Sequence, residues 1–163
     1  MTDDLLSLLQ EFYKDKLAAL LAHISGARLV AQYDANNTYQ YIINREETQL
    51  QWIGQAIVSL GGEVSMFNTE PDRSSAGKGK DAAPRIIGED LRDAQAFVER
   101  WKPRLETMTN VRQRNMLNIV LGETLEQKRF FEQALAGDKE LLGFRSAAVG
   151  ERVGEVMSTR WIE

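Results

Sequence analysis

The feature that most constrains the fold of this chain is an apolar stripe whose spacing alternates between three and four positions. Over residues 39–60 the stripe reads Tyr39, Ile42, Glu46, Gln49, Ile53, Ala56 and Leu60. This spacing is typical of one face of a helix that packs against other helices. Glu46 and Gln49 stand in the middle of that face, where a carboxylate is costly unless it is paired or takes up a proton.

A second stripe repeats the same anomaly further along the chain. It reads Met116, Val120, Glu123, Gln127, Phe130 and Ala134. Here too a carboxylate and an amide, Glu123 and Gln127, interrupt an apolar face near its middle. Two helices with the same costly feature at mid-length predict a shared polar site at the centre of a helical bundle.

Two further stripes complete a set of four helices. One reads Leu6, Leu9, Tyr13, Leu17, Leu20 and Ile24, and the other reads Ile87, Leu91, Ala94, Val98, Trp101, Leu105 and Met108. We expect the first helix to begin at Thr2 or Asp3 and to stop near Gly26. Pro103 is expected to kink or break the third helix just before it, because proline removes a backbone donor.

Turn and capping residues separate the four helices. Residues 33–37 are expected to form a turn, and the second helix ends at Leu60-Gly61-Gly62. The fourth helix is expected to begin at a Thr109-Asn110 cap and to close at Ala136-Gly137. Residues 63–85 carry no apolar period and contain no phosphate-loop context around Gly77–Lys80.

The length of that connection predicts the topology. About twenty residues at roughly 3.3 Å each can return along a helix of roughly 40 Å. The third helix then starts parallel to the second, and two helical hairpins joined by a long crossover form an all-α four-helix bundle over residues 1–137. Residues 138–163 are expected to form a C-terminal arm. Its Trp161-Ile162 pair would dock on the bundle or on a second subunit, which makes a homodimer possible.

Composition limits the function classes. The chain has 163 residues, 43% hydrophobic and 27% charged, which is typical of a globular domain. Its net charge of −4 argues against nucleic acid as the main partner. With no cysteine and one histidine, disulfides, thiolate metal sites and a nucleophilic triad are not expected. No apolar run of membrane-spanning length and no signal-peptide pattern occurs, so we expect no membrane partner and a cytoplasmic location.

The segment Arg45-Glu46-Glu47-Thr48-Gln49, followed eleven residues later by Leu60-Gly61-Gly62, resembles helix two of the ferritin-like superfamily. That superfamily includes bacterioferritin and rubrerythrin, and its pattern is Glu-x-x-His closed by a leucine and a glycine. The stretch Glu123–Phe131 resembles the matching part of the family's fourth helix. The order hairpin, crossover, hairpin also matches over residues 3–136, so the resemblance implies a ferritin-like bundle.

The resemblance also implies a centre of two irons held by four carboxylates and two histidines, and this chain departs from that set. Gln49 stands where the first histidine is expected, and Tyr13 stands where the first helix would supply a glutamate. The third helix presents Leu91 and Ala94 on its stripe instead of a carboxylate. The single histidine, His23, is expected at the helix end or on the surface, out of reach of a mid-bundle site.

Three interpretations of Glu46 and Glu123 remain open. The one that the ligand chemistry favours is a metal-free polar cluster with no cofactor and no catalytic residue. Its members would be Tyr13, Glu46, Gln49, Glu123 and Gln127. On this interpretation the change Glu46→Gln is expected to be tolerated, because it removes a buried charge and keeps a polar shape. A misjudged helix register is another interpretation.

The remaining interpretation is an oxygen-ligand metal site for Fe, Mn or Mg, since hard cations accept carboxylate and amide oxygens. Its candidate ligands are Glu46, Glu123, Glu126, Asp90 and Asp93, the last two only if a rotated register turns them inward. Two functions follow from these alternatives. The chain is either a structural or interaction module that binds a partner, itself or a small ligand, or a carboxylate metalloprotein such as an oxidoreductase.

Overall fold

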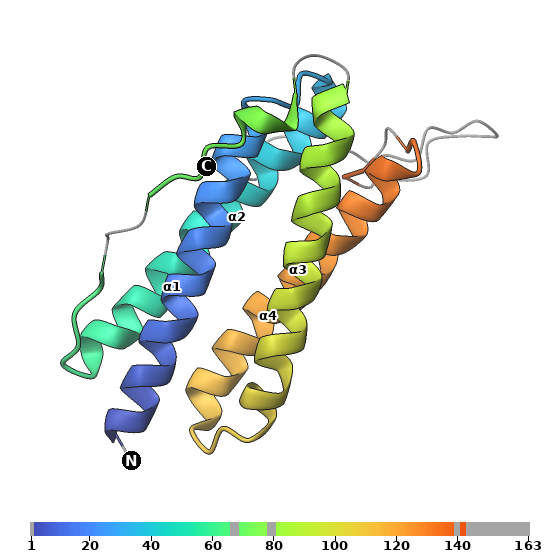
Figure 1. Cartoon of the computed structure of the whole chain (residues 1–163). Helices are drawn as coiled ribbons and strands as arrows, with labels where there is room; N and C mark the ends of the chain where they lie inside the picture. The colour runs from blue at the N-terminus through green and yellow to red at the C-terminus, as the bar shows by residue number, and fades with distance from the viewer. Residues whose placement is uncertain (1, 66–68, 78–80, 139–140, 143–163) are drawn as a thin grey trace, which may run out of the picture.

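A computed structural model describes residues 2–65, 69–77, 81–138 and 141–142 (Figure 1). Its helices are α1 (Thr2–Ala27), α2 (Tyr33–Ser59), α3 (Ala82–Glu106) and α4 (Val111–Leu135), with a short 3-10 turn η1 (Ser74–Ala76) between α2 and α3. All regular structure in this part of the chain is helical. The Trp161-Ile162 end of the expected C-terminal arm lies outside the described residues and stays a prediction.

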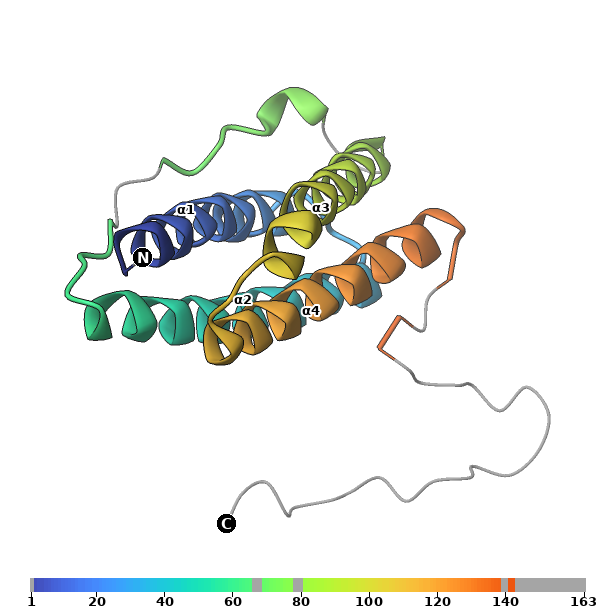
Figure 2. The same cartoon turned by 90° about the horizontal axis from the view of Figure 1, so that it is seen from below.

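The topology is two helical hairpins joined by a crossover. The connection after α2 runs back along the bundle to the start of α3, so α2 and α3 are parallel (Figure 1). Figure 2 shows the hairpin α1–α2 beside the hairpin α3–α4, with α1 next to α3 and α2 next to α4. The predicted all-α four-helix bundle is confirmed. Across the described residues, no helix is both long and apolar enough to cross a bilayer.

The helix ends follow local chemistry. The side chain of Asn110 accepts a hydrogen bond from the backbone N–H of Gln113 at 3.0 Å, which confirms the predicted cap of α4. Gly61 and Gly137 have φ values of 79° and 90°, and these left-handed residues follow α2 and α4 as predicted.

Two local predictions are wrong. Residues 33–37 are not a turn, because α2 already begins at Tyr33. Asn36 instead donates to the carbonyls of Ala27 and Val30 and ties the short α1–α2 loop to the helix. Pro103 does not break α3, which continues to Glu106, and the alternative of a kink there remains a prediction. The proline lies in the last turn, where it removes one backbone hydrogen bond while the buried Leu105 holds the turn against the core.

The core confirms the α2 stripe and most of the α3 stripe, and it corrects the face of α1. Every predicted α2 stripe residue from Tyr39 to Ala56 is buried. On α1 the buried face is rotated from the predicted stripe and reads Leu9, Phe12, Lys16, Leu20, His23 and Ala27. On α3 every predicted stripe residue except the half-buried Leu91 is buried, and the buried face also includes Ile86 and Asp90. The rotated α1 face and the wider α3 face bring charged groups to the centre of the bundle.

Gly26 permits a close approach that positions part of this centre. A Cβ added there would lie 2.8 Å from Arg73 Nη1 on the crossover and 2.9 Å from Ile86 Cγ2 on α3. We therefore expect Gly26→Ala to lower the free energy of unfolding by about 1–3 kcal/mol, as overpacking does. Urea unfolding measures this. Gly122→Ala is the matched control, because nothing lies within 4 Å of its Cβ and the change should stabilise α4 by about 0.5–1 kcal/mol. Equal effects of the two changes would contradict the prediction.

Candidate functional site

The centre of the bundle holds a buried ion-pair triad formed by Glu46, Lys16 and His23. Glu46 has no exposed surface, and Lys16 and His23 are 1% and 4% exposed. Lys16 Nζ donates to Glu46 Oε1 at 2.7 Å, and His23 Nδ1 lies 2.7 Å from Glu46 Oε2. Lys16 and His23 are seven positions apart, about two turns on one face of α1, so they bracket the carboxylate from both sides.

The expectation that His23 lies at the surface and cannot reach the bundle centre is therefore wrong. The expectation assumed that a residue near the end of α1 lies near the surface. However, α1 runs antiparallel to α2, and His23 lies on the buried face of α1 within hydrogen-bond distance of Glu46. Sequence analysis also missed Lys16. The signal was available, because Lys16 and His23 fall on a three-and-four stripe of α1 in the same way that Glu46 falls on that of α2.

The triad holds opposite charges in place. Burial alone would raise the pKa of Glu46, but His23 and Lys16 outweigh it and lower that pKa to about 2. Burial alone would lower the pKa of His23, but the Glu46 carboxylate outweighs it and raises the pKa above its ordinary value. Glu46 is thus an anion, and the fold stabilises the protonated imidazolium of His23 relative to the neutral ring.

This arrangement predicts a pH dependence of stability. Because the folded pKa of His23 is above the unfolded value of 6.5, its contribution is complete below pH 6.5 and is lost as the pH rises through the folded pKa. Lys16, Glu46, Tyr39 and Asp90 are the charged or titratable groups around it. We expect the free energy of unfolding to fall above pH 6.5 by at most about 1.4 kcal/mol per pH unit.

Urea unfolding of the wild type and of His23→Gln between pH 6 and pH 8.5 measures the effect. The variant should lose this slope, because glutamine can still donate to Glu46 but does not titrate. Identical slopes in the two proteins would assign the pH dependence to another group. Glu46 acts in a separate window, since its lowered pKa gives stability that is lost only as the pH falls from about 4.5 toward 2.

A second buried cluster joins α2, α3 and the crossover around Asp90. This carboxylate is 1% exposed and accepts hydrogen bonds from the Tyr39 hydroxyl and from Arg73 Nη1, the latter at 2.7 Å. Arg73 also donates to Glu89 and to the backbone carbonyls of Ala22 and Ile86. Burial raises the pKa of Asp90 in spite of Arg73 and Tyr39. Arg73 had no signal in the sequence, because it lies on a connection without period.

A third cluster lies between α2 and α4. Glu123 accepts hydrogen bonds from the Arg45 guanidinium through both of its oxygens and from the Gln49 amide. The Glu123 side chain is 22% exposed, so this pair lies at the edge of the core. Gln49 Oε1 is sealed in the interior, and it is the one such side-chain atom without a hydrogen-bond partner in the part of the chain described.

The other predicted site residues are dispersed. Tyr13 lies beside Gly54, about two turns of α2 away from Glu46, and lines a separate cavity with Glu63. Glu126 is on the surface and pairs with Arg129 at 3.4 Å. Asp93 is exposed on α3, although it borders the central cavity described next. Glu123 therefore forms a hydrogen bond with Gln49, as the predicted cluster requires. Glu46 instead pairs with Lys16 and His23.

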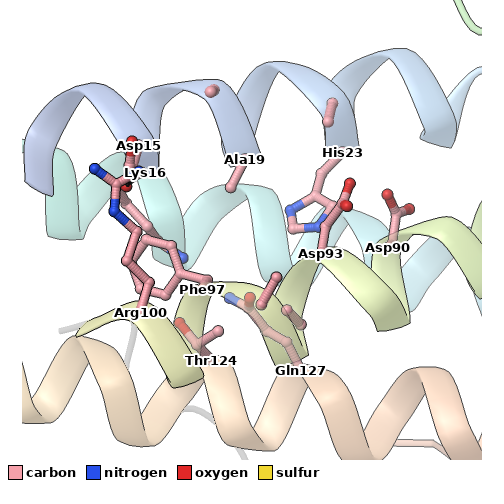
Figure 3. Close-up of a pocket in the computed structure, with 14 residues that line it drawn as sticks. Asp15, Lys16, Ala19, His23, Asp90, Asp93, Phe97, Arg100, Thr124 and Gln127 are labelled. Atoms are coloured by element: carbon pink, nitrogen blue, oxygen red, sulfur yellow. Dashed lines mark ion pairs between the residues drawn. The ribbon is translucent and has the colours of Figure 1, made fainter. Parts of the chain in front are cut away.

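A cavity of about 370 Å³ opens between α1 and α3, with α4 as its floor (Figure 3). Its polar lining includes Lys16 and His23 from α1, Asp90 and Asp93 from α3, and Thr124 and Gln127 from α4. Its apolar lining is Phe97 and a set of alanines from α1 and α3. Those short side chains explain the space, since α1 and α3 pack together less closely than the helices within each hairpin.

The residues present do not fit the di-iron centre that the resemblance implies. Both oxygens of Glu46 are occupied by Lys16 and His23, and both oxygens of Glu123 are occupied by Arg45 and Gln49. The described residues contain no group of three or more His, Cys, Asp or Glu side chains placed to hold a metal ion. A cation at Glu46 would also lie against the Lys16 ammonium, which already neutralises that carboxylate.

Fold and site together define a four-helix bundle whose central carboxylates are neutralised by side chains of the protein itself. Comparisons of this chain with protein-family models, with curated proteins and with solved structures give no match. The chemistry of the site follows from its own geometry. It offers a cavity lined by buried hydrogen-bonding groups, an arrangement suited to binding a ligand.

Proposed function

We propose that this chain is a metal-independent member of the ferritin-like bundles that works as a binding module. The cavity between α1 and α3 is its ligand site. One observation carries the proposal: an ammonium and an imidazole of the protein fill the space around Glu46 where the family places a metal, and they border a cavity. At about 370 Å³ this cavity falls within the usual range of small-molecule sites, about 300–1,000 Å³.

Two features support the proposed relationship to the ferritin-like bundles. The chain has the hairpin, crossover, hairpin order with α2 and α3 parallel, and it has carboxylates at the middle of α2 and α4. The alternative function, an oxidoreductase with a carboxylate metal site, has less support. Of its candidate ligands Glu46, Asp90, Glu123 and Glu126 are all engaged by cationic side chains, and Asp93 alone does not make a cage.

Metal analysis tests the metal-independent part of the proposal. Protein purified without an affinity tag, after growth with added iron and manganese, should contain far less than one equivalent of iron, zinc or manganese after dialysis. Glu123→Gln is the comparison variant, because Glu123 lies at the core edge and its loss should leave the bundle folded. One or two equivalents of metal that survive dialysis and disappear in the variant would overturn the proposal.

The homodimer expected from the C-terminal arm remains a prediction of the sequence. Light scattering and melting curves of the full chain and of a chain without residues 158–163 test it. A loss of both mass and melting temperature would place the arm at a dimer interface, and a loss of melting temperature alone would place it on its own bundle. No change in either would mean that the last six residues contribute to neither.

A further inference from the structure

The hydrogen-bonding groups that line the central cavity are unequally satisfied. Lys16 carries three N–H donors, and its ammonium makes one hydrogen bond, to Glu46 Oε1. His23 makes its single hydrogen bond through Nδ1, which leaves the other ring nitrogen, Nε2, without a protein partner. These statements hold for the described residues. Both side chains line the cavity, so donor capacity is left over on its α1 side.

Gln127 adds a third group of this kind from the opposite side. It is 4% exposed and, within the described ranges, its amide makes no hydrogen bond. Its amide atoms are not sealed in the interior, because Gln127 lines this cavity and also a much smaller hollow beside Arg45 and Glu123. Figure 3 shows Gln127 projecting from α4 toward α1 and α3.

The carboxylates that line the interior of the cavity are, in contrast, already paired. Asp90 accepts from Tyr39 and Arg73, and Asp15 accepts from the Trp101 indole and pairs with Arg100 at 2.9 Å. The Thr124 hydroxyl donates to the Val120 carbonyl of its own helix. Asp93 is the exception, and it is an exposed residue at the rim. The carboxylates inside the cavity are therefore paired, whereas Lys16, His23 and Gln127 keep donors that make no hydrogen bond to the protein.

The charges favour the same conclusion. Glu46 is one carboxylate between two basic side chains, Lys16 and His23, so the triad carries one excess positive charge when His23 is protonated. Asp90 and Asp15, which also line the cavity, are each paired with an arginine. The excess charge of the triad borders the cavity. A buried cation with spare donors is stabilised by an anion that accepts those hydrogen bonds, and the walls of alanine and Phe97 suit an apolar body attached to it.

From this geometry we propose that the cavity binds a small carboxylate with an apolar body, with its oxygens at Lys16, His23 and Gln127. The inference rests on the proposed function, since it names the ligand class of the same cavity. Asp93 at the rim would then repel the ligand weakly. Gln127 would be retained for binding, since an unpartnered buried amide lowers the stability of the free protein.

A matched series of probes tests the ligand class. Benzoate, benzamide, benzyl alcohol and benzylamine share one ring and differ in the group that would meet the donors. Each is titrated into the ¹⁵N-labelled full chain and followed by NMR. Benzoate should shift signals of the cavity residues and bind at least about tenfold more tightly than the neutral probes, as expected for one charge-assisted hydrogen bond.

Two variants are expected to change the affinity for benzoate in opposite directions. Gln127→Met should weaken benzoate binding by about tenfold while leaving the melting temperature equal or higher, because it removes an unpartnered buried amide. Asp93→Asn should strengthen benzoate binding a few-fold, because it removes a like charge at the rim. A Gln127→Met variant that melts lower and binds benzoate as well as the wild type would overturn the role of Gln127 in binding.

The outcomes separate this inference from the proposed function. If benzylamine or benzyl alcohol binds in the cavity as tightly as benzoate, the carboxylate class is wrong and the binding module stands. If none of the four probes shifts a cavity signal at millimolar concentration, the cavity is not a ligand site. Both the proposed binding module and the proposed ligand class are then wrong. Metal content, measured separately, decides whether the bundle is metal-independent.

Discussion

Replacing Glu46 with glutamine is expected to lower the free energy of unfolding by about 3–5 kcal/mol, the cost of breaking a buried ion pair by removing one partner. The change leaves the Lys16 ammonium in the interior without its carboxylate. It also places an amide where His23 Nδ1 needs an acceptor, so one of the two partners faces a donor. The structure thus reverses the expectation from sequence that Glu46→Gln is tolerated.

Urea unfolding at pH 7 measures the loss, and Glu126→Gln is the control. Glu126 is a surface glutamate whose pair with Arg129 is exposed on both sides, so its replacement should change stability by less than about 0.5 kcal/mol. A loss below about 1 kcal/mol for Glu46→Gln would show that the triad is not a buried, charged unit.

A double variant separates the charge from the shape of the site. Lys16→Met together with Glu46→Gln removes both charges of the closest pair, and this should recover part of the stability that either change loses alone. The expected coupling energy is on the order of 2–3 kcal/mol, as for groups in direct contact. Losses that simply add would contradict the pairing of Lys16 with Glu46.

The four helices could be predicted because each has a long apolar stripe, and such a stripe marks the face of a helix that packs against its neighbours. The parallel arrangement of α2 and α3 followed from the length of the crossover alone. The anomaly at Glu46 and Gln49 also indicated correctly that both side chains are buried. What the pattern cannot report is the partner of a buried charge, since that partner lies on another helix.

The errors have one physical origin. The sequence of α1 contains two stripes, and the prediction follows the apolar one through Leu6, Leu17 and Ile24 instead of the one that contains Lys16 and His23. The chain buries the mixed stripe because Glu46 on α2 supplies the opposite charge. On α3 the predicted stripe is buried, and Asp90 is buried beside it because Arg73 reaches it. A stripe interrupted by an acid predicts a second stripe interrupted by a base, and this rule would have found Lys16.

Replacing Arg73 with methionine is the second change for which we expect a loss of about 3–5 kcal/mol. Arg73 lies on the crossover but is only 8% exposed, and its guanidinium contacts both α1 and α3. It donates to Asp90, to Glu89 and to the carbonyls of Ala22 and Ile86 at distances between 2.7 and 3.0 Å. The variant leaves the Asp90 carboxylate buried without its cation, and it removes the additional side-chain donor from the Ala22 and Ile86 carbonyls.

Arg73→Lys should rescue little of this loss, because an ammonium cannot reproduce the fork of a guanidinium that bonds four acceptors at once. Asp90→Asn in the Arg73→Met background should recover part of it, because the uncompensated charge is then gone while the Tyr39 hydroxyl keeps an acceptor. Urea unfolding of these variants measures the free energies. Limited proteolysis of the crossover reports whether the connection detaches before the bundle unfolds.

Arg28→Met is the matched control, because Arg28 also pairs with a crossover carboxylate, that of Glu70, but its side chain is 66% exposed. Its loss should cost less than about 1 kcal/mol, as for surface ion pairs in general. If both arginine variants lose the same small amount, Arg73 is not the buried anchor of the crossover. If Arg73→Met alone unfolds at much lower urea and is cleaved faster in the crossover, one arginine on an irregular connection holds the second hairpin against the first.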